Sequence, residues 1–314
     1  MTTVGQLPVV CLMGPTAAGK TELAVALVQA LPCDIVSVDS AMVYRSMDIG
    51  TAKPDAATRA RAPHRLIDIC DPAESYSAAR FREDARREVD AIHACGRIPL
   101  LVGGTGLYFR AFAEGLAALP GASHSIRQRL QREAREHGWQ ALHARLAEVD
   151  PASAGRIHPN DPQRLQRALE VYELSGQPLS SLWAAAATEP PPYRLIKRVV
   201  APADRQVLRT RAATRFEAML AAGLVSEVEA LYRRGDLHHG MASMRMVGYR
   251  QVWRYLAGQL DYQEMITHAV AATRQLAKRQ LTWFRAERDA RWYDSTEAGL
   301  AERLQDDLQA ELRA

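Results

Sequence analysis

The sequence lacks the features of a membrane or secreted protein. No apolar run approaches the roughly 18 uninterrupted residues that a membrane-spanning helix needs. The first apolar run begins at Val9, which leaves little room for a signal or transit peptide. The four cysteines, Cys11, Cys33, Cys70 and Cys95, form no Cys-x-x-Cys pair, and Cys11 lies inside the first predicted strand, which favours reduced thiols. We therefore expect a cytoplasmic protein with no membrane partner.

The sequence also has little excess charge and no metal-binding pattern. Its formal net charge is +4 over 314 residues, and 47% of the residues are hydrophobic, as in an ordinary folded protein. His238 and His239 are adjacent but have no third ligand at a suitable spacing, and His64 and His158 stand alone. We expect structural or exposed histidines rather than a histidine metal centre.

The most informative pattern that is present is a phosphate-binding loop. Residues 14–21, GPTAAGKT, match G-x-x-x-x-G-K-[ST] in full. The apolar run Val9–Met13 precedes the loop and the helical stretch Thr21–Leu31 follows it, which is the context that this motif requires. Lys20 would neutralise a phosphate, and the Thr21 hydroxyl is placed to ligate Mg²⁺. The sequence predicts that a diphosphate or polyphosphate binds to Gly14, Pro15, Thr16, Ala17, Ala18, Gly19, Lys20 and Thr21.

Apolar runs that alternate with helical patterns predict an α/β fold, in which helices flank a P-loop NTPase-like parallel sheet. Between Ser125 and Ala187 the pattern is helical only, and Pro190–Pro192 predict a stiff link after it. We therefore expect a P-loop core at residues 1–116 and 193–314, interrupted by an all-helical insertion domain at residues 117–192. The predicted strands are Val9–Met13, Asp34–Val38, a weaker Arg65–Ile69, Ile98–Val102, Leu195–Ala201 and an edge strand at Arg291–Asp294.

Asp39 directly follows the second predicted strand. It would lie at the carboxyl edge of the sheet, beside the phosphate-binding loop. A carboxylate there can act as a general base or as a Mg²⁺ ligand. The structural alternative is a capping role, since Asp and Ser40 both favour the start of a turn or helix.

A carboxylate is missing where a P-loop ATPase usually has one to hold Mg²⁺. The strand Ile98–Val102 continues directly into Gly103-Gly104-Thr105-Gly106. Glycines permit close backbone approach, and the Thr105 hydroxyl could bond a phosphate oxygen, although a simple strand-to-helix turn is the alternative. The site is therefore predicted to hold and release a diphosphate rather than to hydrolyse a γ-phosphate.

Basic residues are concentrated near the C-terminus. Residues 245–291 contain nine Arg or Lys but only four Asp or Glu. In a helix from about Tyr262 to Glu287, Arg274, Lys278 and Arg285 fall within about 40° of one another. Leu276 and Trp283 lie opposite and are predicted to face the core. A basic stripe near aromatic residues fits an RNA-binding surface, and a solvated helix face is the simpler alternative.

Taken together, these residues resemble the tRNA dimethylallyltransferase family, also called isopentenyl-tRNA transferases. The matching stretches cover nearly the whole chain, and no departure removes a reactive group. Met42 stands where the family usually has Leu or Gln. The stretches are GPTAAGKT at 14–21, DSAMVY at 39–44, DIGTAKP at 48–54, PHRLIDICDP at 63–72, GRIPLLVGGTGLY at 96–108, HPNDPQRLQRALEVY at 158–172, MRMVGYRQVW at 244–253 and ATRQLAKRQLTWFR at 272–285.

The resemblance implies transfer of a dimethylallyl group from its diphosphate to the exocyclic amine of the adenosine 3′-adjacent to the anticodon of a tRNA. It implies Mg²⁺ as cofactor and the tRNA anticodon stem-loop as partner, and we expect a monomer. It assigns Asp39 as general base, Thr105 to the reaction centre, and Lys20 and Arg215 to the diphosphate. The tRNA contacts that it implies are Asp39, Ser40, Ala41, Met42, Thr105, Arg127, Gln163, Arg164, Leu165, Gln166, Arg167, Arg245, Met246, Val247, Gly248, Tyr249, Arg250, Lys278, Arg279, Gln280, Leu281, Thr282, Trp283, Phe284 and Arg285.

Three alternative functions stay open. A small-molecule kinase of the shikimate or gluconate kinase type shares the P-loop and an early Asp, but it leaves the insertion and the basic helices unexplained. An adenylate isopentenyltransferase uses the same donor with a free nucleotide acceptor, and it leaves the RNA-contacting stretches unexplained. A nucleotide-gated RNA-binding module would need no base at Asp39.

Overall fold

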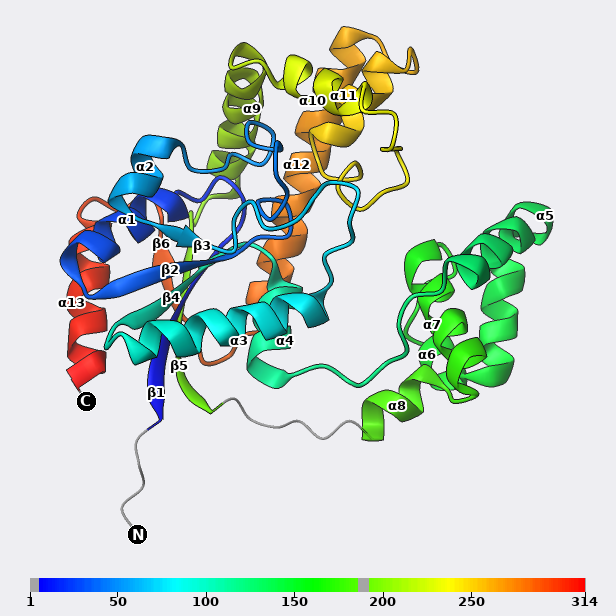
Figure 1. The fold of residues 1–314 in the computed structure, drawn as a ribbon, viewed down its shortest axis with the longest axis horizontal. Helices are drawn as coiled ribbons and strands as arrows, with labels where there is room; N and C mark the ends of the chain where they lie inside the picture. Colours follow the sequence, from blue (N-terminus) through cyan, green and yellow to red (C-terminus); the bar gives the residue numbers. More distant parts are fainter. Residues whose placement is uncertain (1–5, 186–191, 314) are drawn as a thin grey trace. The chain divides into compact units, whose positions relative to one another are not determined.

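The computed structural model describes residues 6–185 and 192–313 (Figure 1). Contacts divide the chain into two compact units, Met1–Ala113 together with Pro191–Ala314, and Glu114–Pro190. The first unit contains the sheet, and the described part of the second unit contains helices and loops. In the predicted proline link, Pro190 and Pro191 lie outside the described residues.

A six-stranded parallel sheet forms the centre of the first unit, with the strand order β3-β2-β4-β1-β5-β6. A parallel sheet flanked by helices confirms the predicted fold class. Since all strands point the same way, the segments that follow β1, β2 and β4 leave from one edge of the sheet. The strands are β1 (Leu7–Met13), β2 (Cys33–Val38), β3 (His64–Arg65), β4 (Ile98–Gly103), β5 (Tyr193–Ala201) and β6 (Arg291–Asp294).

The third strand is much shorter than predicted. The prediction of a strand over Arg65–Ile69 is wrong, because β3 ends at Arg65. Leu66 and Asp68 have φ angles of 62° and 58°, which are left-handed rather than extended. The chain then pairs with a neighbouring loop instead, since the amides of Ile69 and Cys70 both donate to the Val43 carbonyl.

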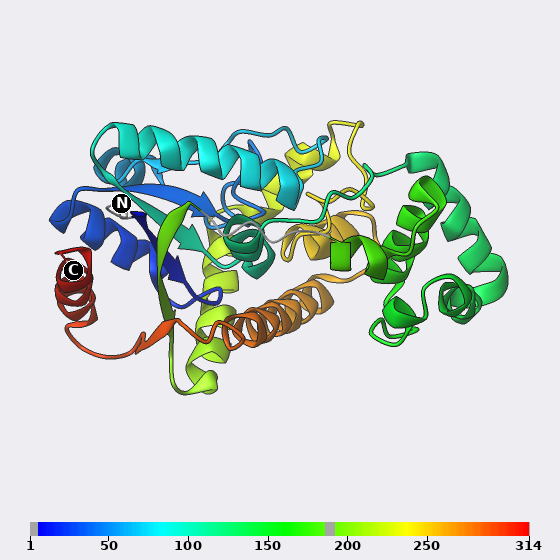
Figure 2. The same ribbon diagram turned by 90° about the horizontal axis from the view of Figure 1, so that it is seen from below.

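Alternate residues of β1 pack in two separate hydrophobic clusters, one on each face of the sheet. Val9, Cys11 and Met13 pack in one cluster, and Val10 and Leu12 pack in the other. Figures 1 and 2 show helices covering both faces. The second cluster is closed by α1 (Lys20–Ala30) and α13 (Leu300–Arg313). The first is closed by α3 (Ala78–Ala94), α4 (Gly106–Glu114), α9 (Arg205–Ala221), α10 (Leu224–Tyr232), α11 (Tyr249–Leu256) and α12 (Tyr262–Phe284).

Local signals explain where several of these helices begin. The Ser77 side chain accepts from the Arg80 amide at the start of α3, and Asp261 and Glu264 form a capping box at the start of α12. The short helix α2 (Ala56–Arg61) begins at Asp55, whose side chain accepts from the Thr58 amide. No helix in the described ranges is long and apolar enough to cross a membrane.

The second unit has a hydrophobic core of its own, built from leucines of three helices. Its first helix, α5 (His124–Val149), is broken at Gly138, where φ is 81° and ψ is 158°. The all-helical pattern predicted from Ser125 onward is therefore confirmed, and α5 consists of two helical halves that meet at Gly138. The remaining helices are α6 (Pro151–Ala154), α7 (Pro162–Ser175) and α8 (Leu179–Ala185).

Candidate active site

The phosphate-binding loop joins β1 to α1, as predicted. Gly19 has a φ of 83°, and Ala17 has a φ of 67°, so the loop turns through two left-handed residues. A side chain at Gly14 would place its Cβ 2.2 Å from the Val200 carbonyl oxygen, so a glycine is required where the loop leaves the sheet. This geometry exposes loop amides to a ligand at the N-terminus of α1.

Lys20 lies within the cavity and donates through Nζ to the Pro15 carbonyl at 2.8 Å. Burial of the ammonium lowers the pKa of Lys20 to about 8. The Asp39 carboxylate opposes this change, whereas the Arg215 guanidinium adds to it. Burial likewise lowers the pKa of Arg215, and Asp39 and Glu22 counteract the effect. The cavity therefore gathers cations in a poorly solvated place, which is how an anion site is built.

Asp39 stands at the end of β2 and organises the turn that follows. Its Oδ1 accepts from the Ala41 amide at 2.8 Å and from the Met42 amide at 3.4 Å. The turn-capping role is therefore present, and it uses only one of the two carboxylate oxygens. No hydrogen bond from the described part of the chain reaches Oδ2, so this oxygen can accept a proton from a ligand.

Thr105 is tied to the Asp39 turn. Its Oγ1 accepts from the Ser40 amide at 3.1 Å, and its own amide lies 3.3 Å from the Val38 carbonyl. Because the hydroxyl oxygen accepts this bond, its proton remains available to a ligand. The turns that carry the two predicted reaction-centre residues are thus held together at the carboxyl edge of β2 and β4 by one side-chain and one main-chain hydrogen bond.

The glycines next to Thr105 allow protein segments to approach closely. A Cβ at Gly103 would lie 2.0 Å from the Val38 carbonyl oxygen, and one at Gly104 would lie 2.5 Å from Gln280 Nε2. A Cβ at Gly106 would lie 2.9 Å from Trp283 Cβ. The glycines therefore allow β2 and α12 to lie directly against this turn, which is the close approach that the sequence predicts.

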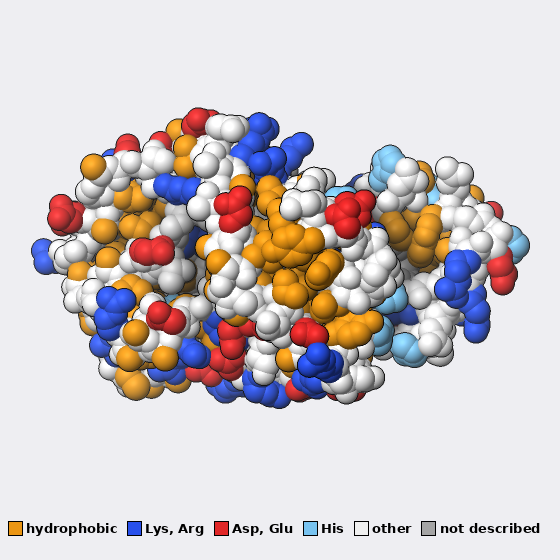
Figure 3. All heavy atoms as spheres, turned by 90° about the horizontal axis from the view of Figure 1, so that it is seen from above, with side chains coloured by type: hydrophobic (Ala, Val, Ile, Leu, Met, Phe, Trp, Pro, Cys, Tyr) orange, Lys and Arg blue, Asp and Glu red, His pale blue; other side chains and the backbone are white. Residues whose placement is uncertain are grey.

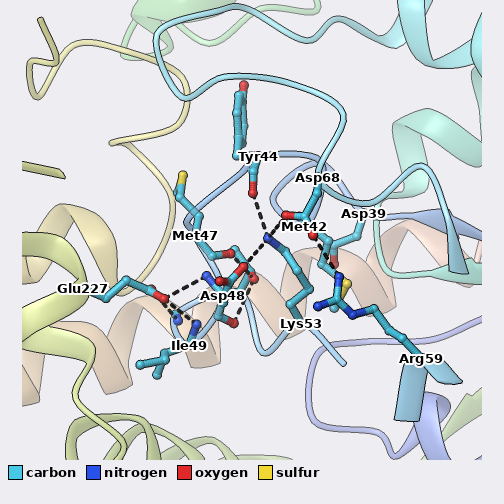
Figure 4. A network of polar contacts seen from close by, with 12 residues as sticks. Asp39, Met42, Tyr44, Met47, Asp48, Ile49, Lys53, Arg59, Asp68 and Glu227 are labelled. Atoms are coloured by element: carbon cyan, nitrogen blue, oxygen red, sulfur yellow. Dashed lines mark hydrogen bonds and ion pairs between the residues drawn. The ribbon is translucent and has the colours of Figure 1, made fainter. Parts of the chain in front are cut away.

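A polar network supports the loop between Asp39 and β3 (Figure 4). The Lys53 side chain is 1% exposed, and its Nζ donates to Asp48 Oδ1 at 2.5 Å, to Asp68 Oδ1 at 2.6 Å and to the Tyr44 carbonyl at 2.8 Å. Arg59 donates to the second oxygen of Asp68 at 2.9 Å. One buried cation thus ties two points of the loop that follows Asp39, at Tyr44 and Asp48, to Asp68 in the segment after β3.

Glu227 supports the same loop from α10 (Figure 4). Its carboxylate accepts from the amides of Asp48, Ile49 and Gly50 at 2.9, 2.8 and 3.2 Å. It also accepts from the Tyr249 hydroxyl at 2.5 Å. Sequence reasoning missed both Lys53 and Glu227 as site-supporting residues, and the only signal was that Lys53 falls within the DIGTAKP stretch.

One cavity of about 1390 Å³ in the first unit is lined by the phosphate-binding loop, the Asp39 turn, Thr105 and Lys53. Glu227 and Asp68 support these segments but are not among the lining residues. The predicted residues that it brings together come from the phosphate-binding loop, the Asp39 turn, Thr105, Arg215, residues 245–249 and α12. From α12 the lining residues are Thr273, Leu276, Arg279, Gln280 and Trp283.

The prediction that Leu276 and Trp283 face the core is wrong, because both are only partly buried and line the cavity. The buried residues of α12 are Met265, Ala269, Ala272, Ala277, Leu281 and Phe284.

Several residues predicted to touch tRNA have buried side chains. Tyr249 and Leu165 are fully buried, and Phe284 and Leu281 are nearly so. Their side chains pack within their units, and of the four only Tyr249 also borders the cavity. Arg274, Lys278 and Arg285 are exposed, as the stripe requires. On the face drawn in Figure 3, Lys and Arg side chains form several separate groups interspersed with acidic ones.

The second unit brings together three of its predicted tRNA-contacting residues. Arg127 donates to both oxygens of Glu170, at 2.8 and 3.0 Å, and Arg167 donates to Glu170 at 2.7 Å. Gln166 donates to the Arg127 carbonyl at 3.1 Å. Burial alone would raise the pKa of Glu170, but the hydrogen bonds from Arg127, Arg167 and the Ser123 amide hold it below its usual value. Gln163 and Arg164 are exposed on the first turn of α7.

The fold and the cavity define a P-loop α/β protein that can bind a phosphorylated ligand beside a carboxylate. The chain belongs to the IPP transferase family, whose family model matches residues 42–287. A tRNA dimethylallyltransferase of Thioalkalivibrio sulfidiphilus (strain HL-EbGR7) is 61% identical over 279 residues, which cover 89% of this chain and 87% of the relative. The family resemblance inferred from the sequence is therefore confirmed.

Solved structures share the fold over almost the whole chain. The tRNA isopentenylpyrophosphate transferase of Bacillus halodurans matches with a TM-score of 0.72 at 36% identity, over 98% of this chain and 97% of the other. The tRNA delta(2)-isopentenylpyrophosphate transferase of Staphylococcus epidermidis matches with a TM-score of 0.70 at 31% identity, over 98% and 99%. A eukaryotic dimethylallyltransferase acting on tRNA has a TM-score of 0.80 at 23% identity, over 97% and 80%, which shows likeness of fold alone.

Proposed function

We propose that this chain transfers a dimethylallyl group from dimethylallyl diphosphate to the exocyclic amine of the adenosine 3′-adjacent to the anticodon of tRNA, and releases diphosphate. The observation that carries the proposal is that one cavity joins a phosphate-binding loop to Asp39 and Thr105. The 61% identity to a tRNA dimethylallyltransferase supports the same reaction here.

The phosphate-binding loop holds the diphosphate of the donor. Loop amides, Lys20 and Arg215 stabilise the negative charge that develops as the C–O bond to the diphosphate breaks. Thr21 lines the cavity and would contribute its hydroxyl to Mg²⁺. Within the described ranges, no group of three or more His, Cys, Asp or Glu side chains could hold a metal, which suits a Mg²⁺ that takes donor oxygens and water as its other ligands. Bound Mg²⁺ would neutralise part of the diphosphate charge.

Asp39 orients the adenosine amine and accepts a proton from it. The amine is a weak nucleophile, so alignment beside the allylic carbon contributes much of the rate. As the N–C bond forms, the amine proton passes to the free carboxylate oxygen of Asp39. Thr105 keeps the Asp39 turn in place through the Ser40 amide and can donate its hydroxyl proton to an oxygen of the donor.

The RNA is held by residues outside the reaction centre. Extrusion of a base from its stack costs a few kcal/mol, which contacts to the surrounding stem and loop must offset. The exposed residues Arg274, Lys278 and Arg285 of the first unit are suited to phosphate contacts. In the second unit we assign the same role to Arg127 and to the exposed or half-buried residues among Gln163–Arg167. We propose that the protein acts as a monomer, and a tRNA acceptor favours the cytoplasm.

One assay separates this function from its alternatives. Protein, Mg²⁺, dimethylallyl diphosphate and tRNA are incubated, with ATP and AMP as rival substrates, and the nucleosides are analysed by mass. Prenylated adenosine in the tRNA is the expected product. Prenylated AMP alone would indicate an adenylate isopentenyltransferase. Hydrolysis or use of ATP without prenyl transfer would refute the proposal.

A further inference from the structure

Gln280 connects the donor loop to the turn that carries Thr105. Its side-chain Oε1 accepts from the Thr16 amide at 2.8 Å, and its Nε2 donates to the Gly104 carbonyl at 2.9 Å. Thr16 belongs to the phosphate-binding loop, and Gly104 immediately precedes Thr105. One side chain of α12 therefore bridges the two segments between which the reaction would take place.

The fit around this side chain is too close to be incidental packing. A methyl group on Gly104 would come within 2.5 Å of Gln280 Nε2 and 3.3 Å of the Gly14 carbonyl oxygen. Trp283, one turn further along α12, covers Gly106 in the same way. Since α12 rests directly on backbone at two glycines, a shift of this helix must move the turn or break the two hydrogen bonds.

We propose that Gln280 is a positioning residue that sets the distance between the donor phosphate loop and Thr105. This assignment rests on the proposed function and replaces the direct tRNA contact that the family resemblance implies for Gln280. Each end of the amide already makes one hydrogen bond within the protein, so its orientation is set by the two segments that it bridges, and only one N–H of Nε2 and one lone pair of Oε1 remain for a ligand. Lys278 and Arg285 of the same helix are exposed, so the helix that we assign to RNA binding also adjusts the donor site.

The first test replaces Gln280 by Met, which keeps length and volume but removes both hydrogen bonds. Gln275→Met on the same helix is the matched control, because Gln275 is exposed and lies outside the cavity lining. Three quantities are measured: affinity for inorganic diphosphate without tRNA by calorimetry, affinity for tRNA, and the single-turnover rate of prenyl transfer. Thermal unfolding reports whether each variant is folded.

We expect Gln280→Met to weaken diphosphate binding at least ~5-fold and to slow single-turnover transfer at least ~10-fold, since small misplacements of reacting groups are costly. Its tRNA affinity should stay within about twofold of wild type, and Gln275→Met should behave as wild type. Weakened tRNA binding with unchanged diphosphate binding would overturn the proposal in favour of an RNA contact. Unchanged diphosphate binding and transfer would overturn it in favour of ordinary packing.

A second variant tests the bridge without replacing Gln280, and by itself it keeps the proposal testable if Gln280→Met does not fold. Gly104→Ala presses a methyl group against the end of the Gln280 side chain and should displace the amide without changing it. It should reproduce the loss of diphosphate affinity, and combining it with Gln280→Met should add little, because both changes break the same bridge. Full additivity of the two losses would contradict the proposal. The diphosphate measurement needs no tRNA, so failure of the prenyl-transfer function and failure of the bridge give different results.

Discussion

The pKa of Lys20 gives a quantitative prediction for donor binding. Burial brings this pKa to about 8, close to the pH at which the enzyme would work. About nine-tenths of the lysine is charged at pH 7 and about one-tenth at pH 9, by the titration of a single group. A diphosphate binds the ammonium form, so binding above pH 8 must take up a proton. Donor affinity should therefore change little between pH 7 and about pH 7.5 and decline as pH rises through 8.

The magnitude follows from the same value. Between pH 7 and pH 9 the affinity for dimethylallyl diphosphate should fall about tenfold, or about 1.4 kcal/mol. The donor itself does not contribute to this change, because its last phosphate ionisation lies near pH 6. Calorimetry of the protein with Mg²⁺ and the donor, without tRNA, measures the affinity at half-unit steps of pH. Calorimetry in buffers of different ionisation enthalpy should also show proton uptake above pH 8.

Lys20→Arg and Lys20→Met are the matched variants. Arginine stays charged throughout this range, and methionine never carries charge, so both should give flat profiles with weaker affinity than wild type at pH 7. A wild-type profile that is flat from pH 7 to pH 9 would refute the reasoning. It would mean that the contacts of Nζ with Pro15 and with the charge of Asp39 keep the ammonium charged in spite of its burial.

Three further predictions concern separate parts of the site. Asp39→Asn keeps the shape of the side chain but cannot accept a proton, so the single-turnover rate of prenyl transfer should fall at least ~10²-fold with little change in tRNA affinity. A near-normal rate would mean that Asp39 only caps the turn that follows it. If Lys278 and Arg285 contact phosphates, Lys278→Ala and Arg285→Ala should each reduce the slope of log tRNA affinity against log salt concentration by roughly 0.7–0.9. An unchanged slope would mean that these side chains only face solvent. Lys53→Met should lower the free energy of unfolding, measured in urea titrations, by about 2–3 kcal/mol. This is less than the usual cost of breaking a buried ion pair, because Asp48 and Asp68 are partly exposed, and a loss under 1 kcal/mol would contradict the prediction.

Features set by local sequence were predictable. The phosphate-binding loop is a contiguous motif, and Asp39 follows a strand whose apolar run is unmistakable. Local reasoning failed where the backbone leaves ordinary regions. Nothing in the composition of Arg65–Ile69 signals that Leu66 and Asp68 adopt left-handed angles, and these angles end the strand after two residues. With these angles Asp68 lies against Lys53, a contact between positions 15 apart that no local pattern predicts.

Helical periodicity predicts which face of α12 is exposed, but not whether the opposite face packs in the core or lines the cavity. Leu276 and Trp283 lie opposite the basic stripe, and apolar residues opposite a charged face usually enter a core. Here that side lines the cavity, because the turn at Gly104 and Gly106 brings backbone up to the helix and leaves open space beside it. A hydrophobic pattern predicts which side chains avoid bulk solvent, but it does not predict whether they pack in a core or line a cavity that binds a ligand.

Glu227, which sequence reasoning missed, and Gln280, to which it gave a different role, share one property: each bonds backbone far away in the chain. Gln280 bonds Thr16 across 264 positions, and Glu227 accepts from the amides around Ile49 across 178. A polar side chain that satisfies distant main-chain groups leaves no spacing pattern, and its backbone partners can be of almost any residue type. Such residues hold the loops on which Lys20 and Asp39 stand. The reacting groups could therefore be predicted from sequence, whereas the structure was needed to find what fixes the distances between them.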